Sequence, residues 1–590
     1  MDLISEIKKD TTKAIKKLWP DFDFSDIGLT VPNNTEFGDY STGIALAIAK
    51  QLKAKPLEIA EQLKAAIGKV KAIGEITVTA PGFVNFVIDY PLLAAEILAS
   101  KAKFSGGKPV NISIEHTSVN PNKAAHIGHL RNACLGDSLG RILRGLGNTI
   151  EIQNYIDDLG LQVADSVVAY ETFGDAPDDW EIDKWLWKIY SDINKKYETH
   201  PELKERRDAV LHEMERGESE TAKAIVERIV PAQLKTFERF GIKYDLLTYE
   251  HDVVNNHLWE KLFEVLQEKR LIHKPIEGPH AGAWIVEYGE SEREDKILVR
   301  SNGILTYTGK DLPLALWKFG KTDEMVGYSK RLLPIFAHIN VIDERQSYPQ
   351  AVIKHVMEEL GYKKEAEHYK HLGYGTVKLS AGAMKQLGLD MDLEDDGKSA
   401  YAMSGRAGIG VMIDDLFTAV VAKQMQDHPE TTPEAAEKIA VGSIRYYMLK
   451  NRPDREIVFD FDEALKTDGN TGVYVQYAYA RANNILEKLS KTNTATQIPE
   501  ELNESETRLI KTMSEAEGVV MSAAEKCDPS LVCDYIYSLA SSFAKFYEAS
   551  PVMKAETETQ KTFRTNLVTS YRDLLGAMLE MVGVPSLPKF

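Results

Sequence analysis

The stretch NPNKAAHIGHL, residues 120–130, follows an alternating apolar segment at 110–114. After it comes a helical stripe of leucine and isoleucine at 135–146, and then a second strand-like segment, TIEIQNY, at 149–155. Strand, loop, helix and strand in this order predict a βαβ unit of a parallel, doubly wound sheet. Ligands bind beyond the carboxyl ends of the strands in such sheets, and the quoted loop lies at one of those ends.

The junction between this loop and the following helix is suited to nucleotide binding. A helix N-terminus presents unpaired N–H groups and a positive dipole end, which bind phosphate. His126 and His129 are three residues apart and can face the same phosphate, while Gly128 lets a flat base approach the backbone. The alternative is that His126 caps or packs and His129 is a surface residue. No metal site is expected, because no third zinc ligand stands at a recognisable spacing.

The composition is typical of a globular chain. Its 590 residues, 43% hydrophobic and 27% charged, allow three or four domains. We expect a cytoplasmic protein, since the N-terminus has no apolar signal segment and no apolar run could span a membrane. Cys134, Cys527 and Cys533 include no C-x-x-C pair and are predicted to be packing residues. The net charge of −18 decides nothing about an RNA partner, because an acidic enzyme can carry a local basic face.

Three composition blocks divide the chain. Residues 1–106 combine helical and strand-like segments and predict a small α+β domain. Residues 107–432 contain the βαβ pattern, with a charged stretch at about 165–275 that we expect to be an insertion of helices. Residues 433–590 are amphipathic almost throughout and predict an all-α bundle. The predicted fold class is therefore α/β, with a parallel-sheet central domain between two smaller domains.

The motifs in these blocks resemble the arginyl-tRNA synthetases, a family of class I aminoacyl-tRNA synthetases. HIGH, preceded by SVNPNKAA and followed by NYIDDLGLQ, is similar to the class I signature. FGDYSTGIALAIA and APGFVNFVI resemble the additional N-terminal domain of the family, and LTYTGKDLPLALWKFG resembles its amino-acid-binding segment. FDFDEALKTDGNTGVYVQYAYARANNIL resembles the start of its helical anticodon-binding domain. The resemblance thus covers nearly the whole chain and implies a Rossmann-like catalytic domain.

The resemblance implies a reaction in two steps. The carboxylate of L-arginine attacks the α-phosphorus of ATP and expels pyrophosphate, and the terminal ribose hydroxyl of tRNA(Arg) then attacks the carbonyl of the adenylate. ATP with its Mg²⁺, L-arginine and tRNA(Arg) are the implied cofactors and partners, with no membrane partner and a monomeric protein. Catalysis would come from positioning and from cations that stabilise phosphate charge.

Two carboxylates are implied as ligands of the substrate guanidinium. A planar guanidinium with five donors requires carboxylates placed for forked hydrogen bonds. By the resemblance these are Glu115 and Asp311, with Tyr307 beside them. A structural alternative exists for Asp311, because it stands two residues before Pro313 and would make a good helix N-cap.

Other residues are implied as ligands of the α-amino and carboxylate ends of arginine. Asn120 and Gln346 match the family positions for this role, and Ser118 assists. The segment DERQSYPQ differs from the sequence that is commoner in the family at this place, so Gln350 is an alternative to Gln346 for this role.

A second loop, at about 398–415, is implied to close over ATP. The ATP-binding residues implied by the resemblance are His126, Gly128, His129, Met403, Ser404 and Arg406. Class I synthetases usually carry K-M-S-K in this loop, but here Ala402 and Gly405 stand in place of the two lysines, and Ala407 is also neutral. Lys123 occupies the place where arginyl enzymes carry a compensating lysine. The implied catalytic residues are therefore Lys123, His126 and His129.

Tyr474, Tyr477 and Arg481 are the implied tRNA-binding residues. The two tyrosines lie three apart on a predicted helix, a spacing that is typical of core residues. The resemblance instead places them where they would face unstacked anticodon bases. It also implies that the N-terminal domain contacts the elbow of the tRNA.

Two other functions remain open from the sequence. A nucleotidylyltransferase shares the H-x-G-H pattern but would not need a tyrosine-rich helical C-terminus. A tRNA-binding relative that has lost amino-acid activation is supported only by Ala402 and Ala407. Lys398 could replace the missing first lysine if it folds inward.

Overall fold

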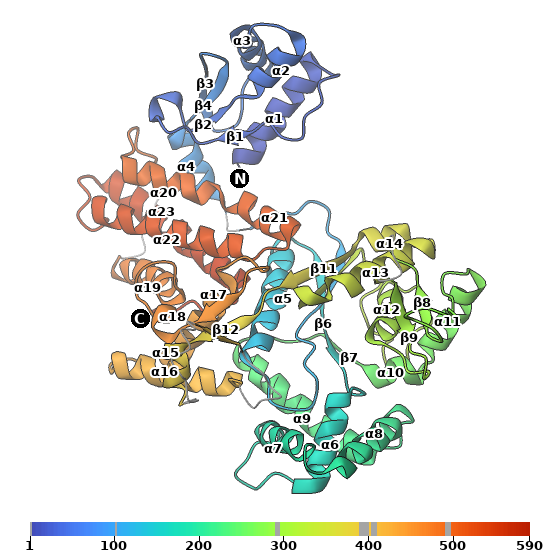
Figure 1. Ribbon diagram of the computed structural model, residues 1–590. Helices are drawn as coiled ribbons and strands as arrows, with labels where there is room; N and C mark the ends of the chain where they lie inside the picture. The colour runs from blue at the N-terminus through green and yellow to red at the C-terminus, as the bar shows by residue number, and fades with distance from the viewer. Residues whose placement is uncertain (1–2, 101–102, 289–294, 389–399, 403–409, 490–496) are drawn as a thin grey trace.

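The computed structural model of the chain describes residues 3–100, 103–288, 295–388, 400–402, 410–489 and 497–590. In Figure 1 the N-terminal domain lies at the top, with the C-terminal helices directly below it. The central parallel sheet and its insertions lie further down and to the right. The predicted α/β fold, with an α+β domain and a helical bundle beside it, is confirmed.

A four-stranded antiparallel sheet in the order β1-β2-β4-β3 forms the N-terminal domain. Its elements are α1 (Leu3–Leu18), β1 (Leu29–Thr30), η1 (Thr35–Phe37), β2 (Tyr40–Thr42), α2 (Ile44–Leu52), α3 (Pro56–Ile67), β3 (Ile73–Thr79) and β4 (Phe83–Ile88). Helix α4 (Tyr90–Ala99) follows, and the Asp89 side chain caps its N-terminus. Because α4 packs against α20 (Glu504–Ser514), this domain rests on the C-terminal bundle.

Five parallel strands form the central sheet in the order β11-β10-β5-β6-β7. They are β5 (Asn111–Glu115), β6 (Thr149–Ile156), β7 (Leu246–Tyr249), β10 (Ala337–Asp343) and β11 (Tyr369–Tyr374). Helix α5 (Ile127–Gly145) follows β5 and packs on β5 and β6 as the predicted βαβ unit. Gly136 allows this close packing, because a Cβ there would lie 2.4 Å from the His116 side chain.

Two insertions interrupt the sheet. The first, between β6 and β7, contains α6 (Leu161–Phe173), α7 (Ile182–Lys196), α8 (Pro201–Glu215) and α9 (Glu220–Arg239), which share an apolar core of their own. The second, between β7 and β10, contains α10 (Glu250–Asn255), α11 (Leu258–Glu268), β8 (Trp284–Val286), β9 (Lys296–Val299) and α12 (Tyr307–Lys318). The single helical insertion expected at about 165–275 is therefore divided by β7, a strand of four residues that belongs to the main sheet.

The chain then passes from the sheet into the bundle. The connecting elements are η2 (Glu344–Gln346), α13 (Ser347–Glu359), α14 (Lys363–Glu367), β12 (Val377–Ser380), α15 (Ala381–Gln386), β13 (Ala400–Ala402) and α16 (Ile413–Asp427). The bundle contains α17 (Pro433–Leu449), β14 (Ile457–Phe459), α18 (Phe461–Ala464), α19 (Gly472–Lys488), α20, α21 (Ala516–Lys526), α22 (Ser530–Ala549) and α23 (Glu558–Met581). Strand β14 pairs with β12, so the segment expected to be all helix also contributes one strand to a small sheet.

A buried arginine joins the bundle to the catalytic domain. The Arg445 guanidinium on α17 donates to Asp137 Oδ2 on α5 at 2.6 Å, to Phe240 O at 2.8 Å and to Val582 O at 3.1 Å. Burial and the two arginines, Arg445 and Arg141, act on Asp137 in opposite directions, and its pKa is lowered overall. The buried guanidinium therefore joins α17 to three other segments inside the protein.

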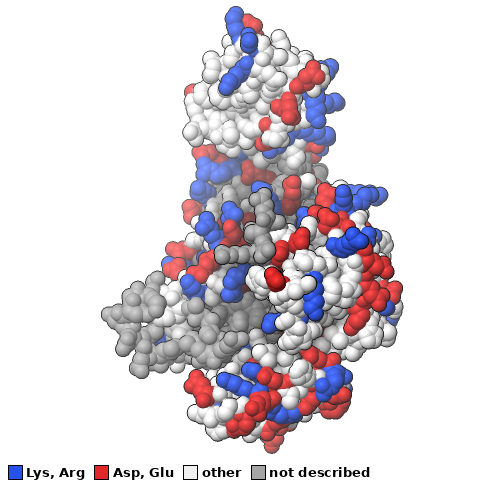
Figure 2. Space-filling view, turned by 45° about the vertical axis from the view of Figure 1, so that its right-hand side comes forward, with Lys and Arg blue, Asp and Glu red and all other residues white. Residues whose placement is uncertain are grey.

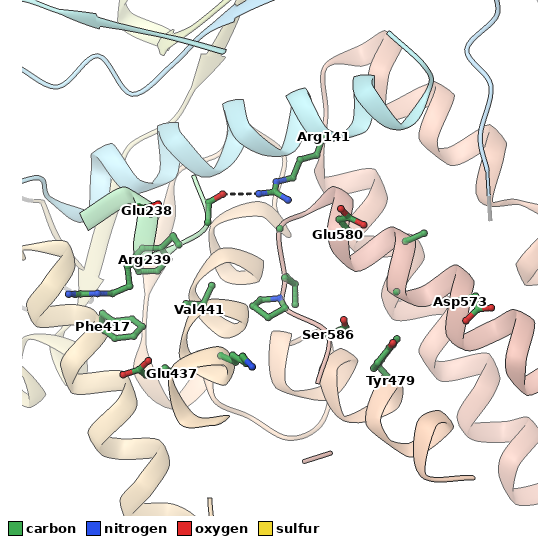
Figure 3. A pocket seen from close by; sticks show the side chains of 18 residues that line it. Arg141, Glu238, Arg239, Phe417, Glu437, Val441, Tyr479, Asp573, Glu580 and Ser586 are labelled. Atoms are coloured by element: carbon green, nitrogen blue, oxygen red, sulfur yellow. Dashed lines mark hydrogen bonds between the residues drawn. The ribbon is translucent and has the colours of Figure 1, made fainter. Parts of the chain in front are cut away.

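A cavity of about 790 Å³ opens beside this junction (Figure 3). Arg141 lies at one side of it and donates to the Gly241 carbonyl at 2.8 Å, the bond drawn as a dashed line. Both acidic and basic side chains line the cavity, among them Glu437 and Arg239. None of the site residues predicted from the sequence lines it.

Cys134, Cys527 and Cys533 are free and buried, as their predicted packing role requires. Within the described residues, no helix has both the length and the apolar character needed to cross a bilayer.

We predict that Arg445→Met destabilises the protein by about 3–5 kcal/mol, because it leaves the Asp137 carboxylate buried with one partner fewer. The measurement is the free energy of unfolding in denaturant. Arg508→Met is the matched control, since Arg508 pairs with Glu504 on the surface and should cost no more than about 1 kcal/mol. Equal effects of the two substitutions would contradict the structural role of Arg445.

Candidate functional site

Four carboxylates gather at the carboxyl ends of the central strands. Glu115 is the last residue of β5, Asp157 follows β6, and Glu250 follows β7 as the first residue of α10. Asp311 joins them from α12, and the Glu115 carboxylate is close enough to raise its pKa. We call these four residues the acidic pocket. The sequence analysis missed Asp157 and Glu250, although their positions directly after strands are a usable signal.

Two lysines of α12 neutralise part of this charge. Lys318 Nζ lies 2.6 Å from Glu115 Oε2, and both side chains are buried. Lys310 forms an ion pair with Glu250, which also accepts a hydrogen bond from the Tyr155 hydroxyl at 2.9 Å. With four carboxyl groups against the two lysines of α12, the acidic pocket contains more acidic groups than these lysines neutralise.

The pKa values of Asp311 and Asp157 are raised, because both carboxyl groups are buried close to other carboxylates. Burial raises the pKa of Asp311 to about 7, the Glu115 carboxylate adds to the increase, and the Lys318 ammonium opposes it. Burial and the neighbouring Glu250 carboxylate likewise raise the pKa of Asp157 well above its usual value. Among the described residues Asp311 forms no ion pair. A cationic ligand would therefore relieve the repulsion in the pocket.

The predicted residues Asn120 and Ser118 lie beside the acidic pocket. Asn120 Nδ2 donates to Asp157 Oδ2 at 3.3 Å. Thr117 and Ser118 adopt left-handed backbone conformations, with φ of 75° and 44°, which are strained for residues with side chains.

Two asparagine side chains hold this strained turn. Asn132 Oδ1, on α5, accepts from the Thr117 N–H at 2.6 Å, and Asn154 Oδ1, on β6, accepts from the Ser118 N–H at 2.9 Å. Neither asparagine carries a local sequence signal, because each acts on a turn that is far from it along the chain.

Tyr307 and Asp311 lie four residues apart on one face of α12. Tyr307 is the first residue of this helix and is 62% exposed. The N-cap is Thr306, whose hydroxyl accepts from the Gly309 N–H, so the alternative that Asp311 caps the helix is wrong. Pro313 lies inside the helix, two residues beyond Asp311.

The two rival glutamines lie in different environments. Gln346 is exposed at the end of η2. Gln350 is buried, and its Oε1 accepts from the Tyr369 hydroxyl at 2.7 Å and from Asn340 Nδ2 at 3.2 Å. Burial, together with the nearby Asp311 and Glu115 carboxylates, raises the pKa of Tyr369. Gln350 therefore belongs to the hydrogen-bond network beside the acidic pocket.

His126 and His129 stack at the N-terminus of α5. Their ring centroids are 3.5 Å apart, and His129 Nδ1 accepts from the His126 N–H at 3.2 Å. Burial and then the Lys123 ammonium lower the pKa of His126 to about 4, and burial also lowers that of His129. Both imidazoles are therefore neutral at pH 7. Gly128 leaves room for this pair, since a Cβ there would lie 3.1 Å from the His126 ring.

A polar atom of this pair lacks a partner. His126 Nδ1 is buried and forms no hydrogen bond with the described residues. A buried polar atom in this state costs free energy unless a ligand or water satisfies it. A phosphate or ribose oxygen bound at the start of α5 could do so.

The Lys123 ammonium is close enough to lower the pKa of both histidines, and two aromatic rings of the first insertion lie beside it. Its Nζ lies 4.8 Å from the Tyr190 ring centroid and 5.9 Å from the Trp187 ring centroid, both on α7. The Trp187 ring also contacts His126 edge-on, at 6.4 Å between centroids. The sequence analysis missed these rings because they lie more than 60 positions further along the chain.

The residues Met403, Ser404 and Arg406 lie outside the described part of the chain, as do Lys398, Gly405 and Ala407. The segment that follows them is bound to the histidine segment. The Ile127 N–H donates to Val411 O at 3.2 Å, and the Ile413 N–H donates to Ala125 O at 3.0 Å.

The predicted tRNA-binding residues share helix α19. Tyr477 is 42% exposed, and the Arg481 guanidinium lies 4.7 Å from its ring centroid and 5.2 Å from that of Tyr547. Tyr474 is half-buried, and its ring lies 5.7 Å from that of Tyr537. The structure thus places Tyr477 and Arg481 together on the surface and turns Tyr474 toward the bundle.

On the face drawn in Figure 2, lysine and arginine side chains gather along the outer edge of the N-terminal domain at the top. Below it, acidic and basic side chains are interspersed.

Comparison with known proteins agrees with this arrangement. Residues 5–88 match the family described as arginyl tRNA synthetase N terminal domain, residues 94–461 match tRNA synthetases class I (R), catalytic domain, and residues 475–590 match the DALR anticodon binding domain. The arginine–tRNA ligase of Pyrococcus furiosus is 33% identical over 98% of each chain. That of Thermus thermophilus is 33% identical over 93% of this chain and 94% of its own. The solved arginyl-tRNA synthetase of Thermus thermophilus matches 99% of each chain with a TM-score of 0.85 and 30% identity.

Proposed function

The chain belongs to the arginyl-tRNA synthetases, and we propose that its acidic pocket binds the guanidinium of L-arginine. The protein is an arginine–tRNA ligase of class I, because the matches to such enzymes extend over nearly the whole chain. These matches do not favour the two alternatives, a nucleotidylyltransferase and an inactive relative. The observation that carries the proposal is the excess of carboxyl groups in the acidic pocket over the two lysines of α12, together with the raised pKa values of Asp157 and Asp311. A guanidinium supplies the missing positive charge and five donors.

Within the pocket, Glu115 and Asp311 are the proposed ligands of the guanidinium. Asp311 supports this role because it has no ion pair among the described residues and a pKa near neutrality, so binding a cation stabilises its charged form. Asn120 and Ser118 would hold the α-amino and carboxylate ends of arginine, and Tyr307 would cover the site. Of the two rival glutamines, Gln350 is favoured over Gln346, because its side chain is buried beside the carboxylates.

The N-terminus of α5 is the proposed site for ATP. His126, Gly128 and His129 would contact its phosphates and base, and neutral imidazoles can donate hydrogen bonds there without repelling the Lys123 cation. Lys123 would stabilise the charge that grows on the leaving pyrophosphate, with Mg²⁺ accompanying ATP as part of the substrate. Met403, Ser404 and Arg406 are proposed to complete the site.

The exposed pair Tyr477 and Arg481 is the proposed contact with anticodon bases of tRNA(Arg), with Tyr474 in a supporting position. An aromatic ring beside a guanidinium offers both stacking and positive charge to an unstacked base. We also propose that the protein acts in the cytoplasm as a monomer, as its membership of the arginyl-tRNA synthetase family implies.

We predict that the protein charges tRNA(Arg) with arginine and rejects citrulline by a factor of about 10⁴ or more, because the neutral isostere leaves buried carboxylates unpaired. The measurement is aminoacylation with each amino acid at saturating ATP and tRNA. The Asp311→Asn variant should lose aminoacylation activity with arginine, so the ratio of its activity with arginine to its activity with citrulline should be smaller. Citrulline or lysine used within tenfold of arginine would refute the assignment of the acidic pocket.

We predict that Lys123→Ala lowers the turnover number about 10²- to 10³-fold with little change in the arginine KM, since it removes a preorganised charge that acts on the transition state. Lys188→Ala is the control, because Lys188 also lies against a tryptophan of α7, Trp185, but outside the site. A turnover number that is the same in both variants would exclude Lys123 from catalysis.

We predict that Tyr477→Ala weakens aminoacylation by about 1–3 kcal/mol in kcat/KM for tRNA, because a stacking surface is lost. Tyr477→Phe keeps the ring and should behave almost as the unmodified protein. A large decrease in the melting temperature of Tyr477→Ala, without a specific effect on the tRNA KM, would instead mean that the ring is a core residue.

A further inference from the structure

The loop from Asn120 to Lys123 is held by the helices of the first insertion. Gln233 on α9 donates from Nε2 to Lys123 O at 2.7 Å and to Asn120 O at 3.1 Å. Ser166 on α6 donates from its hydroxyl to Asn122 O at 2.9 Å. Both side chains are buried, so these bonds are shielded from water. The two ends of the loop are therefore fixed to each other through one amide group.

The side chain of Lys123 is held by the same insertion. Tyr190 and Trp187 on α7 place their rings around its ammonium. The loop backbone is also tied to α7, because the Ala124 N–H donates to Asp183 O at 3.0 Å. Backbone and cation thus depend on helices that supply none of the proposed ligands of arginine.

Helix α9 also reaches the C-terminal end of the second loop, which spans about 398–415. Thr236 Oγ1 donates to Asp414 Oδ2 at 2.9 Å, and Arg239 forms an ion pair with the same carboxylate. Asp414 belongs to the first turn of α16. Gln233 therefore sits on a helix that is bound to both segments of the proposed ATP site.

From these contacts we propose that Gln233 is a positioning residue for adenylate formation. By holding both carbonyls, it fixes the spacing between Asn120, at the α-amino and carboxylate end of arginine, and Lys123, at the phosphates of ATP. The reacting carboxylate and phosphorus must meet in a narrow range of distance and angle, and a displacement of about 1 Å can cost about 10²-fold in rate. This inference rests on the roles proposed above for Asn120 and Lys123.

The first test is Gln233→Met, which keeps the length of the side chain and removes both donors. At saturating tRNA we expect the turnover number to fall about tenfold or more and the arginine KM to rise about fivefold, because the loop loses its fixed spacing. The matched control is Gln476→Met. Gln476 is buried and donates in the same way to two carbonyls, Lys438 O at 3.1 Å and Pro585 O at 2.9 Å, but lies in the bundle.

A purely structural role of Gln233 predicts that the two variants behave alike. Each variant would then have a lower melting temperature and a smaller fraction of active protein, and its arginine KM would be unchanged. Equal arginine KM values in Gln233→Met and the unmodified protein would overturn the proposal.

The second test combines Gln233→Met with Lys123→Ala. If Gln233 acts through the loop that carries Lys123, its effect on turnover should shrink to less than about threefold in the Lys123→Ala background, whereas the effect of Gln476→Met should multiply in full. Full multiplication for Gln233→Met would overturn the inference. A silent Lys123→Ala alone would instead refute the proposed role of Lys123, so the two failures can be told apart.

If Gln233→Met does not fold, Ser166→Ala decides the question. It removes the bond to Asn122 O and should lower turnover about two- to fivefold with a rise in the arginine KM, because one of the restraints on the loop is lost. Unchanged turnover and KM in Ser166→Ala would then overturn the inference.

Discussion

The buried ion pair between Asp137 and Arg445 fixes the helix on which the site is built. Helix α5 begins at the histidine pair, and its middle is bound through Asp137 to the bundle. Helix α5 also carries a buried arginine of its own, Arg131, which donates to the carbonyls of Gly375, Thr376, Arg452 and Pro453. Because breaking a buried charge pair is costly, α5 cannot shift without the bundle. The catalytic and tRNA-binding parts of the chain thus share one rigid element.

The acidic pocket shows how the protein tolerates charge that it does not neutralise. Burying carboxylates is unfavourable, and Lys310 and Lys318 compensate only part of the cost. The part of this cost that the lysines do not offset raises the pKa values of Asp157 and Asp311. If the proposed guanidinium binds here, its positive charge would lower both pKa values, and the unfavourable electrostatics of the free protein would favour a cationic side chain.

Local patterns predicted the parts of the structure that depend on neighbours in the sequence. The βαβ unit follows from periodicity within about 50 residues and the histidine pair from its spacing in the loop, whereas Glu115 was implied only by the resemblance to the family. The partners that complete the site could not be predicted, because Lys318 reaches Glu115 from 203 positions away and Gln233 reaches Lys123 from 110. Tertiary packing also overrode local signals: Asp311 lies inside α12 because Thr306 caps that helix, and the short strand β7 divides the expected insertion.

The strained turn at Thr117 and Ser118 restricts the backbone that leads to Asn120. Two consecutive side-chain-bearing residues in the left-handed region cost about 1–2 kcal/mol each, and glycine would relieve that cost. Glycine would also free the backbone that leads to Asn120. Glycine at these two positions would therefore exchange lower backbone strain for a less restricted turn before Asn120.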